Sequence, residues 1–365
     1  MCGIAGIFSP GQHRAELESW ANCQARAILS RGPDDSGVWV DPVPGIALAH
    51  RRLSILDLSS AGHQPMLSAT GRFVITYNGE IYNHLAIRRE LDQSQLCRGP
   101  WRGYSDTETL LAAIEAWGLV AALQRCVGMF ALALWDRHER VLLLARDRFG
   151  EKPLYWGLSG SGSVGSVPSR AILFGSELSA LRAWPGFSNP IDRQSLAQLL
   201  RFGAIAAPRS IHAGIQQLPP GHLLRLSLGA GLPEQLPESE PWWCLRSTIA
   251  SGLRQPFTDQ HDALEALERC LSEAVQLQSL SDVPLGAFLS GGIDSSLITA
   301  LLQAQSGRPV RTFTIAFEEA GFNEAPYARA VAAHLGTDHN ETLLTSADAQ
   351  ALIPLQPRHG RRGPR

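Results

Sequence analysis

The feature that most constrains the fold of this chain is a proline-rich stretch between residues 205 and 257. Seven prolines interrupt regular structure there, and glycines crowd residues 214–231. Such a stretch favours a connector between folded parts, because proline removes a backbone donor and glycine leaves the backbone free. At 365 residues the chain is also long enough for two cores, since single cores stop growing near about 250 to 300 residues. The sequence therefore predicts two domains, with a connector over 206–257.

Short apolar runs broken by turns dominate the chain through about residue 180. β-branched and aromatic residues predict strands in four of these runs, which are Ile4–Phe8, Phe73–Tyr77, Met129–Trp135 and Val141–Ala145. Apolar residues at helical spacing predict a helix over Thr107–Trp117, with Ser105 and Glu108 as a capping box. Strands in runs with a few helices predict a layered α+β domain.

From Asp262 onward, helices and strands alternate. A helical pattern is followed by a strand at Leu285–Leu289, a glycine turn and a helix through Leu301, and then by a strand at Thr312–Phe317 and a helix around Tyr327–Leu335. This alternation predicts the start of a parallel α/β sheet. A parallel sheet needs both faces covered, and we expect the elements within 262–350 to form an incomplete layer.

The charge balance and the cysteines narrow the class of partner. Basic residues number 32 against 34 acidic ones, so no overall field favours nucleic acid or an anionic membrane, and small metabolites are the expected partners. No signal peptide and no membrane span is indicated. Six scattered cysteines favour a reducing compartment, and we predict a cytoplasmic protein. Lys152 is the only lysine, which we interpret as a coding bias toward arginine rather than as chemistry.

Cys2 is the first candidate for a catalytic role. If Met1 is removed, Cys2 carries a free α-amine of pKa about 7.7 to 8.0 beside a thiol of pKa about 8.5. Nucleophile and general base would then share one residue. A lone cysteine at the start of a strand is more often a small buried apolar residue, so the surrounding motifs must decide.

Five further segments accompany the run Cys2–Gly6. They are Arg31–Asp35, His50–Ile55, Asn78–Asn83, Ser105–Glu108 and Arg146–Tyr155. Together these segments closely resemble the class II glutamine amidotransferases, a branch of the N-terminal-nucleophile hydrolases, and the last one resembles the asparagine synthetase subgroup in particular. The resemblance implies an α+β sandwich of αββα layers over 2–205, in which Cys2 attacks the side-chain amide of glutamine.

The same resemblance assigns the other residues of the glutaminase site. The Asn78 side chain and the Gly79 backbone N–H would stabilise the oxyanion, Arg52 would bind the α-carboxylate of glutamine, and Asp106 would bind its α-ammonium with Glu80 nearby. Taken singly, Asp106 could cap the helix that it precedes and Arg52 could be a surface cation. Arg51 is our candidate for the surface role.

A second motif, Ser290–Ser296, lies between the strand Leu285–Leu289 and a helix that we expect to begin near Leu297. A glycine turn that opens into a helix directs backbone N–H groups at an anion, although such a turn is also found as a plain linker. The motif lacks the Gly-Lys-Ser/Thr ending of a Walker loop and resembles the pyrophosphate-binding loop of ATP pyrophosphatases. The resemblance implies a partial α/β ATP-pyrophosphatase-type domain over 258–353. It places Glu324 in the acceptor half and assigns these ATP-binding residues: Ser290, Gly291, Gly292, Asp294, Ser295, Ile315 and Phe317.

The implied reaction is glutamine-dependent asparagine synthesis. Ammonia from glutamine would attack an aspartyl adenylate formed from ATP with Mg²⁺, and no prosthetic group is expected. The resemblance fades after about Leu352, which predicts a truncated synthetase domain followed by a disordered tail over 354–365 that looks like translation past a frameshift. Two alternatives therefore stay open, a glutaminase without synthesis and a non-catalytic remnant that binds nucleotide or a partner. Metal ligands are not identified, and a homodimer stays open.

Overall fold

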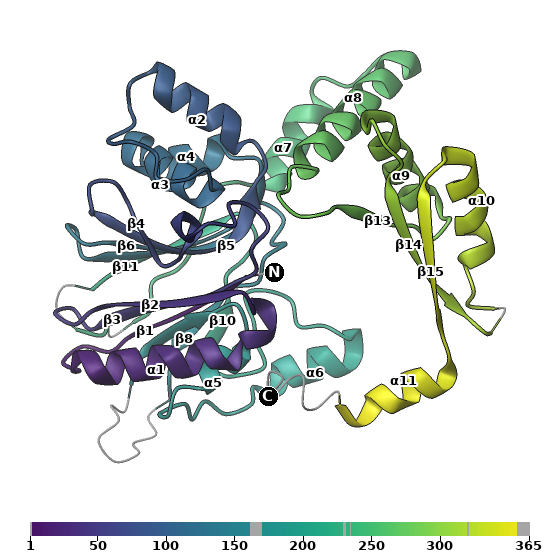
Figure 1. Cartoon of the computed structure of the whole chain (residues 1–365). Helices are drawn as coiled ribbons and strands as arrows, with labels where there is room; N and C mark the ends of the chain where they lie inside the picture. Colours follow the sequence, from purple (N-terminus) through teal and green to yellow (C-terminus); the bar gives the residue numbers. More distant parts are fainter. Residues whose placement is uncertain (1, 161–169, 229–230, 234, 320, 356–365) are drawn as a thin grey trace. The chain divides into compact units, whose positions relative to one another are not determined.

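A computed structural model of the chain describes residues 2–160, 170–228, 231–233, 235–319 and 321–355. The chain divides into two compact units, the first extending to Ile249 and the second beginning at Ala250 (Figure 1). The division falls within helix α7 (Leu245–Leu253). Among the described residues, no helix is both long and apolar enough to span a membrane.

The first unit consists of two six-stranded sheets with helices outside them (Figure 1). One sheet has the order β10-β8-β9-β1-β3-β2, and its strands are β1 (Gly3–Phe8), β2 (Asp35–Asp41), β3 (Ile46–Arg52), β8 (Tyr155–Leu158), β9 (Ile172–Gly175) and β10 (Ile215–Gln217). The other has the order β12-β11-β7-β6-β5-β4, and its strands are β4 (Met66–Leu67), β5 (Phe73–Ile81), β6 (Gly128–Asp136), β7 (Val141–Arg146), β11 (His222–Ser227) and β12 (Glu240–Pro241). All strand pairs within the two sheets are antiparallel.

Helices cover the outer faces of both sheets. On the first sheet lie α1 (Arg14–Ala27) and α5 (Leu178–Arg182), and on the second lie α2 (His84–Gln93), α3 (Asp106–Trp117) and α4 (Leu119–Arg125); α6 (Arg193–Phe202) follows α5 along the chain (Figure 1). Strand β1 shows why the layers form, because alternate side chains of a strand point to opposite faces. Ile4 and Phe8 are buried between the sheets, whereas Ala5 and Ile7 are buried under α1. The predicted αββα layering is confirmed.

The predicted strands and helix of this unit are present, with β5 longer than expected. The predicted capping box is only half right. The Ser105 hydroxyl accepts a hydrogen bond from the Glu108 N–H (3.3 Å), as a cap should. The Glu108 carboxylate instead accepts from the backbone N–H groups of Arg102 (2.8 Å) and Gly103 (3.1 Å), and so holds the preceding loop against α3.

The prediction of an irregular connector over 206–257 is wrong for the part that contains β10 and β11. Strand β10 pairs with β8 and β11 pairs with β7, so both belong to the sandwich. The alternating residues Leu224 and Leu226 of β11 are buried between the sheets. The prediction failed because the prolines flank β10 and β11 rather than interrupt them, as Pro219 and Pro220 show by preceding β11. Pro241 lies within β12, which is an edge strand, where proline is tolerated.

The second unit contains a three-stranded parallel sheet in the order β13-β14-β15, as the alternating pattern predicts. Its strands are β13 (Gly286–Phe288), β14 (Arg311–Phe317) and β15 (Asp338–Leu344), and its helices are α8 (Gln260–Gln278), α9 (Ile293–Gln305), α10 (Ala325–Leu335) and α11 (Ser346–Leu352). Helix α9 begins four residues earlier than expected, directly after the glycine turn. Of the predicted tail 354–365, residues 356–365 lie outside the described residues.

One face of this sheet is covered and the other is not. On β14, Thr312 and Thr314 are buried, whereas Phe313 and Ile315 are 40% and 53% exposed. Phe288, which pairs with Phe313 and so shares its face, is 84% exposed. The expected incomplete layer is thus present in the described residues.

The place of β11 in the first unit can be tested by truncating one buried side chain. Leu224→Ala removes a fully buried leucine from the core between the sheets, and we expect a loss of about 2 to 5 kcal/mol in the free energy of unfolding. The neighbouring Arg225 is exposed, so Arg225→Ala is the matched control and should change stability by less than about 0.5 kcal/mol. Urea titration followed by tryptophan fluorescence measures both. Equal effects from the two variants would contradict this assignment of β11.

Candidate active site

The six residues predicted for the glutaminase site line one pocket of the first unit, together with others that include Gln64, Tyr77 and Lys152; the six are Cys2, Arg52, Asn78, Gly79, Glu80 and Asp106. They come from four places in the fold. Cys2 directly precedes β1, Arg52 ends β3, residues 78–80 belong to β5, and Asp106 begins α3. Strands β1 and β5 belong to different sheets and lie against each other, so the pocket is built where the two layers meet.

Two residues hold Cys2 in place: Leu53 bonds its side chain, and Arg31 bonds its backbone carbonyl. The Leu53 N–H donates to the Cys2 Sγ (3.4 Å), and the thiol donates to the Leu53 carbonyl (3.6 Å). The Arg31 Nε donates to the Cys2 carbonyl (2.9 Å), and Arg31 also forms an ion pair with Glu177 (3.0 Å). Burial raises the pKa of the Cys2 thiol, while the Leu53 N–H opposes this rise. A thiol with a raised pKa needs a base to become a nucleophile.

Asn78 and Gly79 combine an unsatisfied donor with a close backbone contact. The Asn78 side chain is 1% exposed, and its amide nitrogen has no hydrogen-bond partner among the described residues. Leaving a buried donor unpaired costs about 1 to 3 kcal/mol, so this group is suited to a ligand acceptor. At Gly79 a Cβ would lie 2.3 Å from the Met129 carbonyl oxygen, and only glycine fits there.

Arg52 is a buried cation held by backbone oxygens. Its guanidinium donates to the carbonyls of Ser59 (3.1 Å), Leu56 (3.1 Å) and Asp57. A Cβ at Gly62 would lie 2.0 Å from the Arg52 Nη2, so a glycine leaves the room that the guanidinium occupies. The alternative that Arg52 is a surface cation is therefore wrong. Arg51, predicted to be the surface residue, is half-buried.

Asp106 and Glu80 bring two carboxyl groups into the same pocket. Asp106 accepts hydrogen bonds from the Tyr77 hydroxyl (2.9 Å) and the Ile81 N–H (2.9 Å), and Ser105 caps the helix, so the alternative of Asp106 as the cap is wrong. Burial raises the pKa of Asp106, and the bonds from Ile81 and Tyr77 oppose this rise. Burial and the nearby Asp106 raise the pKa of Glu80 to about 7.

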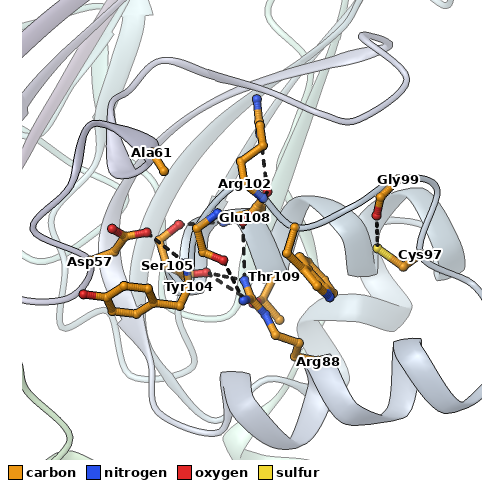
Figure 2. A network of polar contacts seen from close by, with 12 residues as sticks. Asp57, Ala61, Arg88, Cys97, Gly99, Arg102, Tyr104, Ser105, Glu108 and Thr109 are labelled. Atoms are coloured by element: carbon orange, nitrogen blue, oxygen red, sulfur yellow. Dashed lines mark hydrogen bonds and ion pairs between the residues drawn. The ribbon is translucent and has the colours of Figure 1, made fainter.

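A polar network that the sequence did not reveal joins two loops that lead to pocket residues (Figure 2). The Arg88 guanidinium donates to the Gly103 carbonyl (2.8 Å) and the Thr109 hydroxyl (3.1 Å), and it pairs with the Glu108 carboxylate (3.5 Å). Asp57, whose φ is +55°, accepts from the Tyr104 N–H (2.9 Å). The network thus joins the loop that holds Arg52 to the loop that leads into Asp106. Most of its residues lie outside the matched motifs, and their residue types are frequent in any sequence. Sequence patterns alone therefore could not identify the network.

Of the predicted ATP-binding residues in the second unit, Ser290, Gly291 and Gly292 lie in the loop from β13 to α9, and Asp294 and Ser295 lie in the first turn of α9. Gly291 has φ +79°, and a Cβ there would lie 2.6 Å from the Tyr327 Cβ. The hydroxyl oxygens of Ser290 and Ser295 are 2.9 Å apart and close the turn. Gly292 is the N-cap of α9 and has no side chain to accept from the first-turn N–H groups, and its own N–H donates to the Ser290 hydroxyl (3.3 Å). This geometry leaves a helix N-terminus suited to an anion.

The remaining predicted residues of this unit lie on neighbouring elements. Ile315 and Phe317 are on β14, the strand beside β13, and Glu324 precedes α10. Among the described residues, no group of three or more His, Cys, Asp or Glu side chains is placed to hold a metal ion.

Two packed antiparallel sheets with outer helices, and a cysteine in the pocket at the start of a central strand, define an N-terminal-nucleophile amidotransferase fold. The family model described as the glutamine amidotransferase domain matches residues 1–236, and the chain belongs to this family. A second family model, asparagine synthase, matches residues 266–364.

Individual relatives agree with both matches. Asparagine synthetases [glutamine-hydrolyzing] 1 and 3 of Bacillus subtilis (strain 168) are 30% and 32% identical to this chain, over 97% and 95% of its length and 52% and 55% of their own. The chain thus spans about half the length of these curated relatives. The solved glutamine phosphoribosylpyrophosphate amidotransferase of B. subtilis, in complex with ADP and GMP, is 15% identical with a TM-score of 0.44, over 93% of this chain and 65% of that one.

The raised pKa of Glu80 predicts how stability depends on pH. The ordinary pKa of 4.5 applies to the unfolded chain and a pKa of about 7 to the folded one, so the folded state loses stability from this group as pH rises from 4.5 through 7. Glu80→Gln removes this loss. Its free energy of unfolding should therefore rise relative to wild type between pH 5 and pH 8. Urea titrations at several pH values measure the difference.

The exposed Glu18 on α1 supplies the control for this measurement. Glu18→Gln should show no comparable change with pH, because solvent screens an exposed carboxylate. A Glu80→Gln difference that is constant from pH 5 to pH 8 would show that the carboxyl titrates normally in the fold.

Proposed function

We propose that the first unit hydrolyses glutamine at Cys2 and releases ammonia. The observation that carries this proposal is the buried, unpartnered amide nitrogen of Asn78 in the pocket that also contains Cys2. An anion that develops beside the sulfur would give this donor its missing acceptor. Preorganised donors of this kind are worth about 3 to 4 kcal/mol each in acyl transfer.

The proposed chemistry begins with a free α-amine on Cys2. The amine takes the thiol proton while Sγ attacks the side-chain carbonyl carbon of glutamine, and the carbonyl electron pair moves onto oxygen. The oxyanion accepts hydrogen bonds from the Asn78 amide and the Gly79 N–H. The C–N bond then breaks, the protonated amine returns its proton to the leaving nitrogen, and ammonia departs. Water hydrolyses the resulting thioester to glutamate.

The other pocket residues match the remainder of a glutamine molecule. Arg52 is already bound by carbonyl oxygens, which orient its guanidinium toward a further acceptor such as the α-carboxylate. Asp106 and Glu80 supply oxygens for the α-ammonium. The pocket therefore offers a cation and carboxyl groups at one end and a hydrogen-bond donor at the other. This arrangement favours a zwitterionic ligand with a neutral side-chain amide over a simple amide.

The test of hydrolysis is a set of three variants. Cys2→Ala should abolish glutamate formation from glutamine, and Asn78→Ala should lower kcat by about 10²- to 10³-fold with a smaller effect on KM, because the oxyanion exists only after attack. The exposed Cys23 gives the control, and Cys23→Ala should behave as wild type. Intact-mass measurement reports whether Cys2 carries a free amine. Activity that persists in Cys2→Ala would end the proposal.

For the protein as a whole we propose glutamine-dependent asparagine synthesis. The match of residues 266–364 to asparagine synthase and the relatives of that name support this proposal. The β13–α9 loop would bind the phosphates of ATP, and Mg²⁺ would be held mainly by phosphate oxygens, with Asp294 in the first turn of α9 available as an acidic ligand. ATP with Mg²⁺ would activate the carboxylate of the acceptor. Aspartate is the proposed acceptor; a relative named amidase chry2, from Gibberella zeae, is 28% identical, so the name asparagine synthetase is not shared by all relatives.

Synthesis is tested separately from hydrolysis. With glutamine, aspartate, ATP and Mg²⁺, the protein should form asparagine, AMP and pyrophosphate in equal amounts. Ser295→Ala removes a hydroxyl that closes the loop, and it should lower AMP formation at least tenfold while glutaminase activity remains. Glutamate formation with no AMP would instead favour the glutaminase without synthesis. Nucleotide binding with no turnover would favour a non-catalytic remnant. Cytoplasmic location and a homodimer stay predictions.

A further inference from the structure

We propose that Lys152 is a positioning residue of the glutamine pocket, which keeps Glu80 available as an anionic partner for the α-ammonium of the substrate. This inference rests on the proposed glutaminase function. It also revises our interpretation of the lysine count. A coding bias toward arginine explains why the other basic positions lack lysine. It does not explain why position 152 has one, so the surroundings of Lys152 must.

Lys152 is buried and lines the pocket with Cys2, Asn78, Glu80 and Asp106; the residue is only 4% exposed. Lysine is seldom buried to this extent unless a charged partner or a function offsets the loss of hydration. An arginine fork is larger and needs several acceptors in one plane, whereas an ammonium is a compact point charge. A narrow pocket wall that must also admit a ligand therefore favours lysine.

Two buried side chains, Asp147 and Arg146, fix the turn that carries Lys152. The Asp147 carboxylate accepts hydrogen bonds from the N–H groups of Phe149, Glu151 and Lys152 (3.0 Å each) and of Phe130 on β6 (3.2 Å). The Arg146 guanidinium donates to the Lys152 carbonyl (2.8 Å) and to the Leu218 carbonyl (2.7 Å). The backbone of residue 152 is thus held on both sides, which fixes the origin of its side chain at the pocket.

The charges around the pocket explain why a cation is needed there. Arg52 and Lys152 supply two positive charges, and Asp106 and Glu80 supply two negative charges when ionised. Together they give a neutral pocket, which suits a zwitterionic ligand with an uncharged side chain. Without Lys152 the two carboxyl groups would share the pocket with one cation fewer, and Glu80, whose pKa burial and Asp106 already raise to about 7, would take up a proton. A protonated carboxyl offers the α-ammonium only a weak acceptor.

Other ionisable groups act on Glu80 and Lys152 and must be considered in any pH measurement. Lys152 lowers the pKa of Glu80 against the effects of burial and of Asp106 on α3. The turn itself contributes Asp147 and Glu151, and Arg31, at the end of the 3₁₀ helix Leu29–Arg31, also acts on the charge of Lys152. The tyrosines Tyr77 and Tyr82 also interact with Glu80, but burial raises their pKa values well above neutrality, so they do not titrate in the range of interest.

The test compares pH profiles of kcat/KM for glutamine. Because Glu80 must be ionised and the Cys2 α-amine must be neutral, kcat/KM should rise with pH along an acid limb to which both groups contribute. In Lys152→Met this limb should move upward by about one pH unit, so that kcat/KM falls on the order of tenfold at pH 7 and recovers by pH 8.5. Lys152→Arg keeps a positive charge and should keep the limb near its wild-type position. A purely structural role predicts a loss that is the same at every pH.

A double-mutant cycle identifies the partner through which Lys152 acts. In a Glu80→Gln background no carboxyl remains at position 80, so adding Lys152→Met should not move the limb further. The double variant also removes both buried charges together, which keeps the comparison available if Lys152→Met alone folds poorly. A limb that moves equally in both backgrounds would overturn the proposal.

A labelling experiment separates this inference from the proposed function. A diazoketone analogue of glutamine should alkylate Cys2 in the wild type, and a wild type that is not labelled would contradict the glutaminase itself. Where the wild type is labelled, Lys152→Met should react about tenfold more slowly with the analogue at pH 7, and at the wild-type rate with iodoacetamide, which lacks the α-groups. Equal rates with the analogue would overturn the role of Lys152 alone.

Discussion

The pocket of the first unit depends on the cost of removing charges from water. A buried ion is tolerated only where internal partners replace its hydration. Arg52 has three backbone carbonyls, and Asp106 has the Tyr77 hydroxyl and the Ile81 N–H. Arg88 and Glu108 form an ion pair in the network that joins the adjoining loops (Figure 2). Each of these groups is fixed by its partners before a ligand arrives, and such preorganisation is what a binding site for a small zwitterion requires.

The two units differ in how firmly they hold a site. In the first unit one large cluster of buried side chains lies between the sheets and two more lie under the outer helices, and the pocket residues are attached to strands from both layers. In the second unit the cluster of described residues consists of Leu289, Ala328 and Ala332, with Val331 packed against it. The β13–α9 loop is nevertheless well defined, because Gly291 packs against α10 and the serine hydroxyls close the turn. Local hydrogen bonds, more than a deep core, hold the proposed nucleotide loop.

Motifs predicted the pocket residues well because their chemistry is tied to a few residue types in a fixed order. Arg52, Asn78 and Asp106 lie far apart in the sequence, and the structure brings all three to Cys2. Composition was less reliable. The proline content of 206–257 concealed β11, whose alternating leucines would have predicted a strand.

Pairwise contacts were the least predictable part. Glu108 has the position of a capping-box residue, but its carboxylate binds the backbone of the loop before α3, and local spacing cannot distinguish these two outcomes. Lys152 was attributed to coding bias because a residue count contains no information on burial. The layered α+β class was predictable from the runs of strands with a few helices, whereas the αββα order was implied by the resemblance to the class II glutamine amidotransferases.

The pocket contains two unfavourable features that one ligand would relieve together. Glu80 and Asp106 raise each other's cost of ionisation, and the Asn78 amide nitrogen has no acceptor among the described residues. The α-ammonium of glutamine would lower the cost of ionising Glu80 and Asp106 as soon as it binds. The cost of the unpaired Asn78 amide would be lowered fully only when the carbonyl oxygen of the substrate becomes an anion. The α-groups therefore contribute mainly to affinity and Asn78 mainly to rate. Because both costs arise in the folded state, binding of glutamine should also stabilise the first unit against unfolding.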